Sequence, residues 1–424
     1  MSNLAPVAAG ATVAIRYAGA MIPGLDVAAV RRRFPALADG NAYLDGPAGT
    51  QVPRAVIDAI AGLLEEGVSN QGGRFASSRL AGEVVSGARQ AAADLMGTDP
   101  EGVVFGPNMT TLTFAFSRAL ARRWRPGDEV VVTSLDHDAN VTPWRLAAEE
   151  RGAVVRRVEF DPADGTLPED AFRSALGPRT RLAAFTAASN ALGTVTPFPA
   201  LIEAAQGVGA VTYLDAVHHS AHRPVDLFAL GVDFVAASSY KFFGPHLGLV
   251  AARPEVLMEH EPYRLEPAPA IGPGRWETGT PSFELLAGLT AAVEHLASLG
   301  SGPDRRARVL SGYAAIADHE AALCERFMEG LESIPAVRLH GIDDRRRMAE
   351  RVATFAVSVD GVAPGEVARR LGEDGIFVWD GDYYAPAVMR RLGLAEAGGL
   401  VRIGFVHYNT EEEVDRVLAA LATF

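Results

Sequence analysis

The sequence predicts an α/β protein with a large domain built on a mostly parallel sheet of seven strands and a smaller C-terminal α+β domain. Short, largely apolar runs alternate with helical patterns over residues 102–252, which is typical of parallel strands covered by helices on both faces. From about Phe283 the pattern changes to long helices followed by strand-like runs, which indicates a second domain. With 424 residues, 48% of them hydrophobic and 21% charged, the chain is long enough for two domains and a large buried core.

The expected strands of the large domain lie at 102–105, 129–133, 154–158, 182–186, 211–215, 234–237 and 248–252. Helical patterns between them are found, for example, at 111–123, 144–151, 168–176 and 199–207. Pro168 suits the first turn of its helix, where its missing N–H would have no partner anyway. In the smaller domain, helices are expected at 283–299, 313–331, 364–371 and 411–421, and strands at 352–359 and 401–405. We therefore divide the chain into an N-terminal extension (1–25), a large domain with an N-terminal arm (26–290) and a small domain (291–424).

The composition argues against several classes of function. A net charge of −13 is unfavourable for a nucleic-acid partner, because nucleic-acid-binding proteins concentrate basic charge on one face. No apolar run is long enough to span a membrane, and the first 25 residues lack the pattern of a secretory signal, so we expect a cytoplasmic protein. A single cysteine, Cys324, excludes an internal disulfide framework and a metal cluster built on cysteines.

The most informative residue count concerns the basic side chains. Of 39 lysines and arginines, only Lys241 is a lysine. A lysine amine can lose its proton and attack a carbonyl, which arginine cannot do, so Lys241 is a candidate for that chemistry. It follows the expected strand at 234–237, at the edge where a parallel sheet binds ligands, and Ser238 and Tyr240 beside it can donate hydrogen bonds to a phosphate. The alternative is that one lysine survived in a loop by chance.

Three more groups follow expected strands. Asp215 ends the strand at 211–215 and either pairs with a cation, such as a protonated pyridine nitrogen, or caps the next helix. The turn at 105–111 leads into a helix and offers backbone N–H groups to a phosphate, although it lacks the Walker pattern. His137 either stacks on a flat cofactor or is an ordinary loop histidine.

A metal site is the minor alternative. Histidine and aspartate are good metal ligands, and they gather at Asp136, His137, Asp138, His218, His219 and His222. Their spacing matches no metal motif, so we expect no metal. Together, a lysine, an acid, a phosphate seat and a flat ring at strand ends indicate one cofactor site.

The order of the motifs resembles the class V aminotransferase family of fold-type I enzymes that depend on pyridoxal 5'-phosphate (PLP), and within it the cysteine desulfurase-like and selenocysteine lyase-like branch. The resemblance covers nearly the whole chain from about Leu25 onward. It rests on seven motifs in the family's order, which are Tyr43-Leu-Asp45, Asp136-His-Asp-Ala-Asn140, Ser189-Asn-Ala-Leu-Gly-Thr194, Asp215-Ala-Val-His218, Ser238-Ser-Tyr-Lys241, Glu277-Thr-Gly-Thr-Pro281, and Arg402 with Tyr408-Asn-Thr410.

The resemblance implies a role for each site residue. Lys241 would hold PLP as a Schiff base and move the Cα proton, Asp215 would pair with the pyridine nitrogen, and His137 would stack on the ring. The other implied cofactor contacts are His218 at the ring oxygen, Thr110, Ser238 and Tyr240 at the phosphate, Met109, Asn190, and Thr280 at the phosphate of a neighbouring subunit. The implied substrate contacts are Arg402 and Asn190 at the carboxylate, with Ala48, Trp379, Tyr383 and Tyr384. The shared phosphate implies an obligate homodimer.

One departure from the family bears on the substrate. Where the desulfurases carry a persulfide-forming cysteine and a loop arginine, this chain has Tyr384 and Trp379. Cys324 lies in a helical pattern well upstream and cannot replace that cysteine. Because a phenol cannot accept sulfur as a persulfide, we expect an α,β-lyase that cleaves the C–S bond of cysteine or, in preference, of an S-substituted cysteine.

Other reactions remain open, because PLP activates every bond at Cα and the pocket decides which one breaks. They are decarboxylating oxidative deamination, transamination and epimerisation. Some enzymes of lincosamide-antibiotic synthesis that are related to this family act on S-cysteinyl intermediates, so secondary metabolism is a candidate context. The alternative from another class is a non-catalytic PLP-fold binding module, against which Lys241, Asp215 and Arg402 argue, since such a module need not keep them all.

Overall fold

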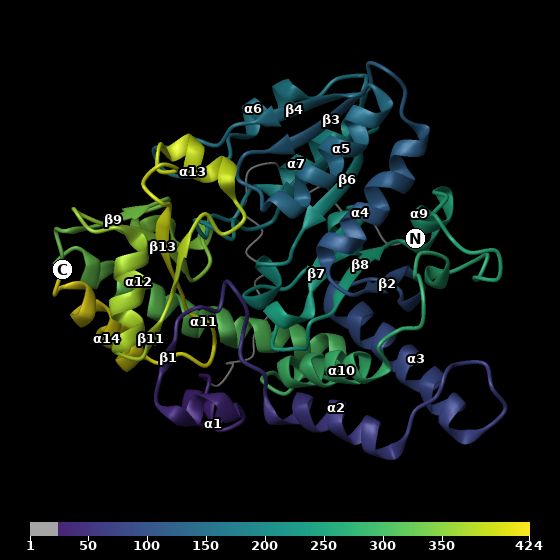
Figure 1. Cartoon of the computed structure of the whole chain (residues 1–424), viewed down its shortest axis with the longest axis horizontal. Helices are drawn as coiled ribbons and strands as arrows, with labels where there is room; N and C mark the ends of the chain where they lie inside the picture. The colour runs from purple at the N-terminus through teal and green to yellow at the C-terminus, as the bar shows by residue number, and fades with distance from the viewer. Residues whose placement is uncertain (1–23) are drawn as a thin grey trace, which may run out of the picture.

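The computed structural model describes residues 24–424 and contains a large sheet and a smaller one, each with its own helices, and a further pair of short strands (Figure 1). The large sheet has seven strands in the order β2-β8-β7-β6-β5-β3-β4. They are β2 (Val103–Gly106), β3 (Glu129–Thr133), β4 (Val154–Val158), β5 (Thr180–Thr186), β6 (Val211–Asp215), β7 (Phe234–Ser238) and β8 (Gly248–Ala252). All neighbours are parallel except β8, which is antiparallel to both β2 and β7. The predicted mostly parallel sheet of seven strands is confirmed.

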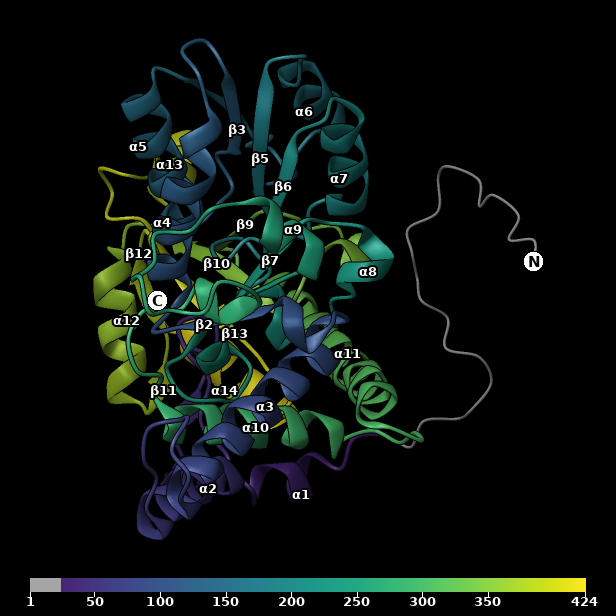
Figure 2. The same cartoon turned by 90° about the vertical axis from the view of Figure 1, so that its right-hand side faces the viewer.

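Helices cover both faces of this sheet, as its largely apolar strands require. Alternate strand residues belong to opposite cores: Phe185 packs edge to face on Phe172 and shares its core with Val131, whereas Val130 and Ala184 belong to the core on the other face. Figure 2 shows α4 and α5 on one side of the sheet and α6 and α7 on the other. The helices of this part are α2 (Arg54–Glu66), α3 (Ala76–Met96), α4 (Met109–Leu120), α5 (Thr142–Arg151), α6 (Glu169–Ala175), α7 (Phe198–Gly207), α8 (Leu227–Leu230), α9 (Pro254–Glu259) and α10 (Phe283–Ala297).

The smaller sheet is antiparallel, with the strand order β12-β13-β10-β9. Its strands are β9 (Val337–His340), β10 (Thr354–Val359), β12 (Trp379–Gly381) and β13 (Leu400–Gly404). Its helices are α12 (Pro364–Glu373), α13 (Pro386–Leu392) and α14 (Glu411–Leu421). This arrangement agrees with the α+β character predicted for the C-terminal part.

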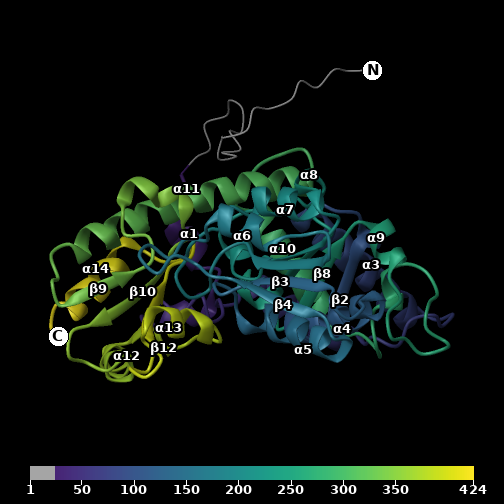
Figure 3. The same ribbon diagram turned by 90° about the horizontal axis from the view of Figure 1, so that it is seen from above.

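Two elements connect the two sheets. Helix α11 (Arg305–Leu331) contacts both α3 and α14, and Figure 3 shows it running along both parts of the molecule. The N-terminal arm, which begins with α1 (Val27–Arg31), crosses to the C-terminal part, where β1 (Ala42–Tyr43) and β11 (Ile376–Phe377) form a separate parallel sheet of two strands. The division at residues 290 and 291 remains a prediction, and all but the last two residues of the predicted N-terminal extension lie outside the described residues.

The structure corrects some element boundaries. The second long helix begins at Arg305, eight residues before the predicted start at 313, because Asp304 caps it by accepting from Ala307 N. Pro168 is the N-cap residue of α6 and lies just outside the first turn. A proline lacks an N–H at either position, so the sequence could not distinguish them. None of the described helices is both long and apolar enough to cross a membrane.

Candidate active site

The predicted site residues converge where β6 and β7 end. Asp215 is the last residue of β6 and pairs in register with Ala236 of β7, and Lys241 ends the 3-10 helix that follows β7. Both side chains are buried, with exposed fractions of 8% for Lys241 and 5% for Asp215. Two neighbouring parallel strands therefore bring an amine and a carboxylate to the same edge of the sheet.

Lys241 lies in a buried and partly cationic environment. Its Nζ donates a hydrogen bond to Pro47 O and lies 4.9 Å from the centre of the Tyr240 ring. Burial, and then the charge of Arg402, lower the pKa of Lys241 to about 7, while the carboxylate of Asp215 opposes this shift. The amine can therefore become neutral and nucleophilic near neutral pH.

Asp215 has few partners for a buried carboxylate. Its Oδ1 accepts a hydrogen bond from Val217 N at 2.9 Å. The following 3-10 helix begins after His218 and has no side-chain cap, which argues against the alternative that Asp215 caps a helix. Burial raises the pKa of Asp215 to about 6, against the opposing effects of the Val217 N–H and Lys241. A carboxylate in this position needs a cationic partner to stay ionised.

The predicted phosphate seat is the first turn of α4, which lies beside the end of β7. Met109 N points at Ser238 Oγ at 3.4 Å. Gly248 on β8 allows this close approach, because a Cβ there would lie 2.2 Å from the carbonyl carbon of Asn108. Thr110 is exposed at the start of the helix. Thr111 N donates to Asn108 Oδ1 at 2.8 Å, and the dipole at the start of this helix of 12 residues favours a bound phosphate.

His137 is held at the end of a well-fixed loop after β3. The buried carboxylate of Asp136 accepts from Asn140 Nδ2 at 2.7 Å and keeps the loop in place. The imidazole stacks on Tyr384, with ring centres 5.5 Å apart and an angle of 11° between the planes. Burial, and then the charge of Lys241, lower the pKa of His137 to about 4, so its flat ring is neutral at pH 7.

Arg402 and Asn190 meet on the other side of the site. Arg402 Nη1 donates to Asn190 O at 2.8 Å, and its guanidinium carbon lies 4.4 Å from the centre of the Tyr383 ring. Asn190 Nδ2 donates to Tyr383 O at 2.9 Å. The bond to Asn190 O is the one hydrogen bond of the Arg402 side chain to residues 24–424, so most of its donor fork can bind a carboxylate.

His218 lies between the two sheets. Its Nε2 forms a 2.9 Å hydrogen bond with Thr354 Oγ1 on β10, and its ring meets His222 edge to face at 5.1 Å. Burial lowers the pKa of His218 well below its ordinary value, and the charges of His222 and Lys241 add to this shift. A neutral His218 still has one ring N–H, which can donate a hydrogen bond to an oxygen on the cofactor ring.

The N-terminal arm, which carries the predicted substrate contact Ala48, closes another side of the site. Thr50 N and Oγ1 both donate to Tyr240 O at 3.0 Å, which holds Pro47 and Ala48 beside Lys241. Asp45 starts this turn, and burial raises its pKa to about 6 while Arg402 and Lys241 oppose the shift. Asp45 is therefore a site residue to which the sequence had given no role, although its motif was recognised.

Trp379 differs from its predicted place. We expected it in a loop, but it lies in β12 directly opposite Arg402 of β13. It is 52% exposed, and opposite residues of an antiparallel pair share a face of the sheet. A three-residue edge strand is too short to be recognised by its pattern, and pairing with β13 stabilises it.

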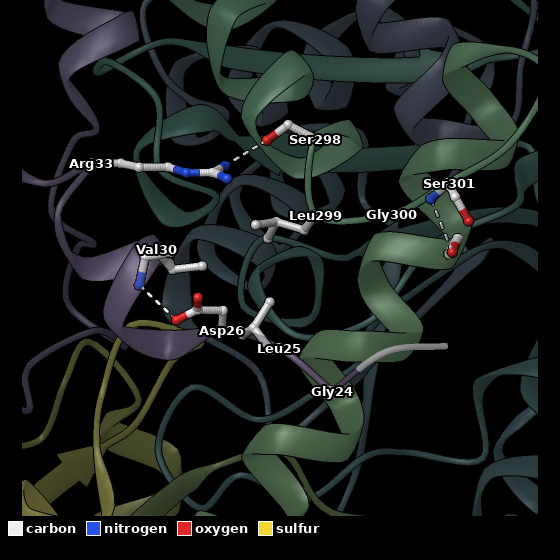
Figure 4. Close-up of a pocket in the computed structure, with 11 residues that line it drawn as sticks. Gly24, Leu25, Asp26, Val30, Arg33, Ser298, Leu299, Gly300 and Ser301 are labelled. Atoms are coloured by element: carbon white, nitrogen blue, oxygen red, sulfur yellow. Dashed lines mark hydrogen bonds between the residues drawn. The ribbon is translucent and has the colours of Figure 1, made fainter. Parts of the chain in front are cut away.

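Thr280 lies away from the amine and the carboxylate. It is exposed and lines a groove of about 710 Å³ together with Thr111 of α4. A second cavity, of about 250 Å³, lies between α1 and the end of α10, where Arg33 donates to Ser298 (Figure 4). It holds none of the predicted site residues. Within residues 24–424, no three histidine, cysteine or acidic side chains converge to hold a metal ion.

The comparisons with known proteins identify the family. The sequence matches the family described as Aminotransferase class-V over residues 42–417. The chain belongs to the class V aminotransferase family. It is 33% identical over 412 residues to a probable cysteine desulfurase of Pseudomonas aeruginosa, covering 92% of this chain and 96% of that protein.

Solved structures agree with this class V aminotransferase assignment. A cysteine desulfurase from Thermococcus onnurineus has a TM-score of 0.84 and 27% identity, covering 96% of this chain and 99% of that chain. The cysteine desulfurase CsdA of Escherichia coli has a TM-score of 0.81 and 26% identity, covering 93% and 97%. The predicted family, fold type and kind of enzyme are confirmed, and with them the PLP cofactor.

The residues of this class V aminotransferase site fit PLP. Asp215 is a buried carboxylate with no ion pair to any of residues 24–424, which suits a protonated pyridine nitrogen. Lys241 offers an amine, His137 a flat neutral ring, and the first turn of α4 a seat for a phosphate. The individual contacts of these residues with PLP remain predictions.

The turn at Tyr383 and Tyr384 leads to a prediction about stability. Both residues have φ near 56°, a left-handed conformation that costs residues other than glycine and asparagine roughly 1–2 kcal/mol. Tyr384 is 74% exposed, so replacing it removes little packing apart from the stacking on His137. Tyr384→Asn is expected to raise the free energy of unfolding by up to about 1 kcal/mol, measured by urea denaturation. Tyr263→Asn, at an exposed tyrosine without positive φ, should give no such gain, and an equal gain in both would contradict the explanation.

Proposed function

We propose that this enzyme is a PLP-dependent C–S lyase that acts on an S-substituted cysteine by α,β-elimination. The observation that carries the proposal is Tyr384, which stands where the resemblance expects a persulfide-forming cysteine and stacks on His137. The one cysteine of the chain, Cys324, is buried in α11, and burial raises the pKa of its thiol to about 12. Since no enzyme thiol is available to receive sulfur, the sulfur leaves with the substituent of the substrate.

The residues of the site support each step of this reaction. When bound, PLP supplies an electron sink for negative charge at the substrate Cα. Arg402 and Asn190 bind the substrate carboxylate, and Asp215 holds a negative charge beside the pyridine nitrogen. Lys241 Nζ removes the Cα proton, holds it, and returns it to the departing sulfur. Overall, the S-substituted cysteine and one water give a thiol, pyruvate and ammonia.

Product analysis tests the proposal. The PLP-loaded enzyme is incubated with S-ethyl- and S-benzyl-L-cysteine, and pyruvate and free thiol are measured in parallel. We expect equal amounts of the two products, because breaking one Cβ–S bond releases one of each. Release of carbon dioxide with an aldehyde would instead indicate decarboxylating oxidative deamination, and alanine would indicate desulfurase chemistry. Either result would contradict the lyase.

We also propose that the enzyme is a homodimer with shared active sites. Thr280 lines the same groove as the first turn of α4, beside exposed apolar side chains such as Tyr263, which is 61% exposed. An open groove of this kind next to a phosphate seat suits contact with a second copy of the chain. In such a dimer, Thr280 of one subunit would reach the phosphate bound by the other. Light scattering of the PLP-loaded enzyme is expected to give twice the mass of one chain, and a stable monomer would contradict the proposal.

A further inference from the structure

The ring of Tyr384 is both fixed and accessible. One face stacks on His137, with ring centres 5.5 Å apart and planes 11° apart. The residue is nevertheless 74% exposed, the largest exposed fraction of any tyrosine among the large hydrophobic side chains of residues 24–424. His137 thus covers one face of the Tyr384 ring, and the high exposed fraction leaves the other face open to a ligand.

The turn that carries this ring is held in an unfavourable conformation. Tyr383 and Tyr384 are consecutive residues with φ of 56°, a backbone angle that residues other than glycine and asparagine rarely adopt. Hydrogen bonds from both sides hold it: Asn190 Nδ2 donates to Tyr383 O at 2.9 Å, and Asp138 N donates to Tyr384 O at 2.7 Å. Such strain is common in ligand-binding segments, because it persists only where the surroundings impose one orientation.

The same turn borders the expected seat of the substrate carboxylate. The guanidinium of Arg402 lies 4.4 Å from the centre of the Tyr383 ring, directly next to Tyr384 in the chain. Trp379 lies opposite Arg402 in the β12–β13 pair, shares its face of the sheet, and is 52% exposed. Two exposed aromatic residues therefore lie close to Arg402, Trp379 on the facing strand and Tyr384 next to Tyr383 in the chain.

We propose that the S-substituent of the substrate contains a flat, unsaturated ring that stacks on the free face of Tyr384. This inference rests on the proposed lyase function and narrows its substrate class. A flat ring gains offset stacking energy on Tyr384 beyond the burial of apolar area, whereas a saturated ring of similar size gains the burial alone. Tyr384 is thus a specificity-determining residue.

A matched pair of substrates separates stacking from bulk. S-benzyl- and S-(cyclohexylmethyl)-L-cysteine have the same carbon skeleton, but only the first carries a flat ring. We expect the PLP-loaded wild-type enzyme to prefer S-benzylcysteine by about three- to tenfold in kcat/KM. The preference should persist in Tyr384→Phe and fall toward unity in Tyr384→Leu, and Phe228→Leu, at an exposed phenylalanine of α8, should leave it unchanged. The two thiols differ in how readily they leave, but this difference is the same in every variant. It therefore cancels when the ratio of the two kcat/KM values is compared between variants.

Binding measurements separate this inference from the proposed function. Dissociation constants of both substrates are measured by calorimetry on PLP-loaded Lys241→Ala, with and without Tyr384→Leu. A preference in binding that Tyr384→Leu removes, without pyruvate release by the wild type, supports the inference and contradicts the lyase. Pyruvate release with equal kcat/KM for both substrates, or a preference that survives Tyr384→Leu, overturns the inference and leaves the lyase intact.

Discussion

Replacing Lys241 with alanine is expected to lower pyruvate release from S-substituted cysteines by at least about 10⁴-fold, since it removes both the nucleophile and the general base. The side chain is the single lysine of the chain and lies at the end of β7 with a pKa lowered to about 7. No second amine can replace it. Turnover of the PLP-loaded variant is measured with the same assay as for the wild type, and persistent elimination would show that another group is the base.

Lys241→Arg is the matched control for charge. Arginine keeps the positive charge and much of the volume but does not lose its proton, so this variant should be as inactive as the alanine variant.

In the wild type, the rate of PLP loading should rise about tenfold per pH unit below pH 7 and level off above it, because only the neutral amine of Lys241 reacts. A rate that keeps rising to pH 10 would indicate an ordinary lysine. Borohydride reduction and peptide mapping should then find the pyridoxyl group on Lys241.

Asp215→Asn is expected to act in opposite directions on activity and on stability. Turnover should fall by about 10²- to 10³-fold, the usual cost of removing one preorganised electrostatic group from an active site. The cofactor-free variant should nevertheless be more stable than the cofactor-free wild type at pH 7, by up to roughly 3 kcal/mol. The reason is that burial raises the pKa of Asp215 from 3.8 to about 6, so the folded protein holds its charge at a cost.

The pH dependence gives this prediction its sign. Between pH 4 and 6, the folded wild type binds more protons at Asp215 than the unfolded chain does, so its stability falls as the pH rises. The gain in Asp215→Asn should therefore be small near pH 4 and complete above pH 6, as measured by urea denaturation of the cofactor-free proteins. Asp318→Asn, at an exposed aspartate of α11, should show no gain. A gain that does not depend on pH would contradict burial of the charge as its cause.

The site was more predictable at strand ends than in turns. Lys241, Asp215 and His137 could be placed from the sequence, because an apolar strand fixes the position of the residue that follows it. Trp379 could not, because a three-residue strand at a sheet edge has no pattern of its own and forms by pairing with β13. Asp45 was missed as a functional residue, since its role depends on an arm that crosses from one sheet to the other.

We could read from the amino-acid sequence alone the alternation of strands and helices, the single lysine, and the absence of a cysteine at the position of Tyr384. These are properties of composition and local order, which periodicity and motif order preserve. The folded molecule was needed to show that Arg402 meets Asn190, that Tyr384 stacks on His137, and how far the pKa of each buried group moves. Such contacts join residues more than 200 positions apart, and burial depends on the whole packed molecule, so no local pattern encodes them.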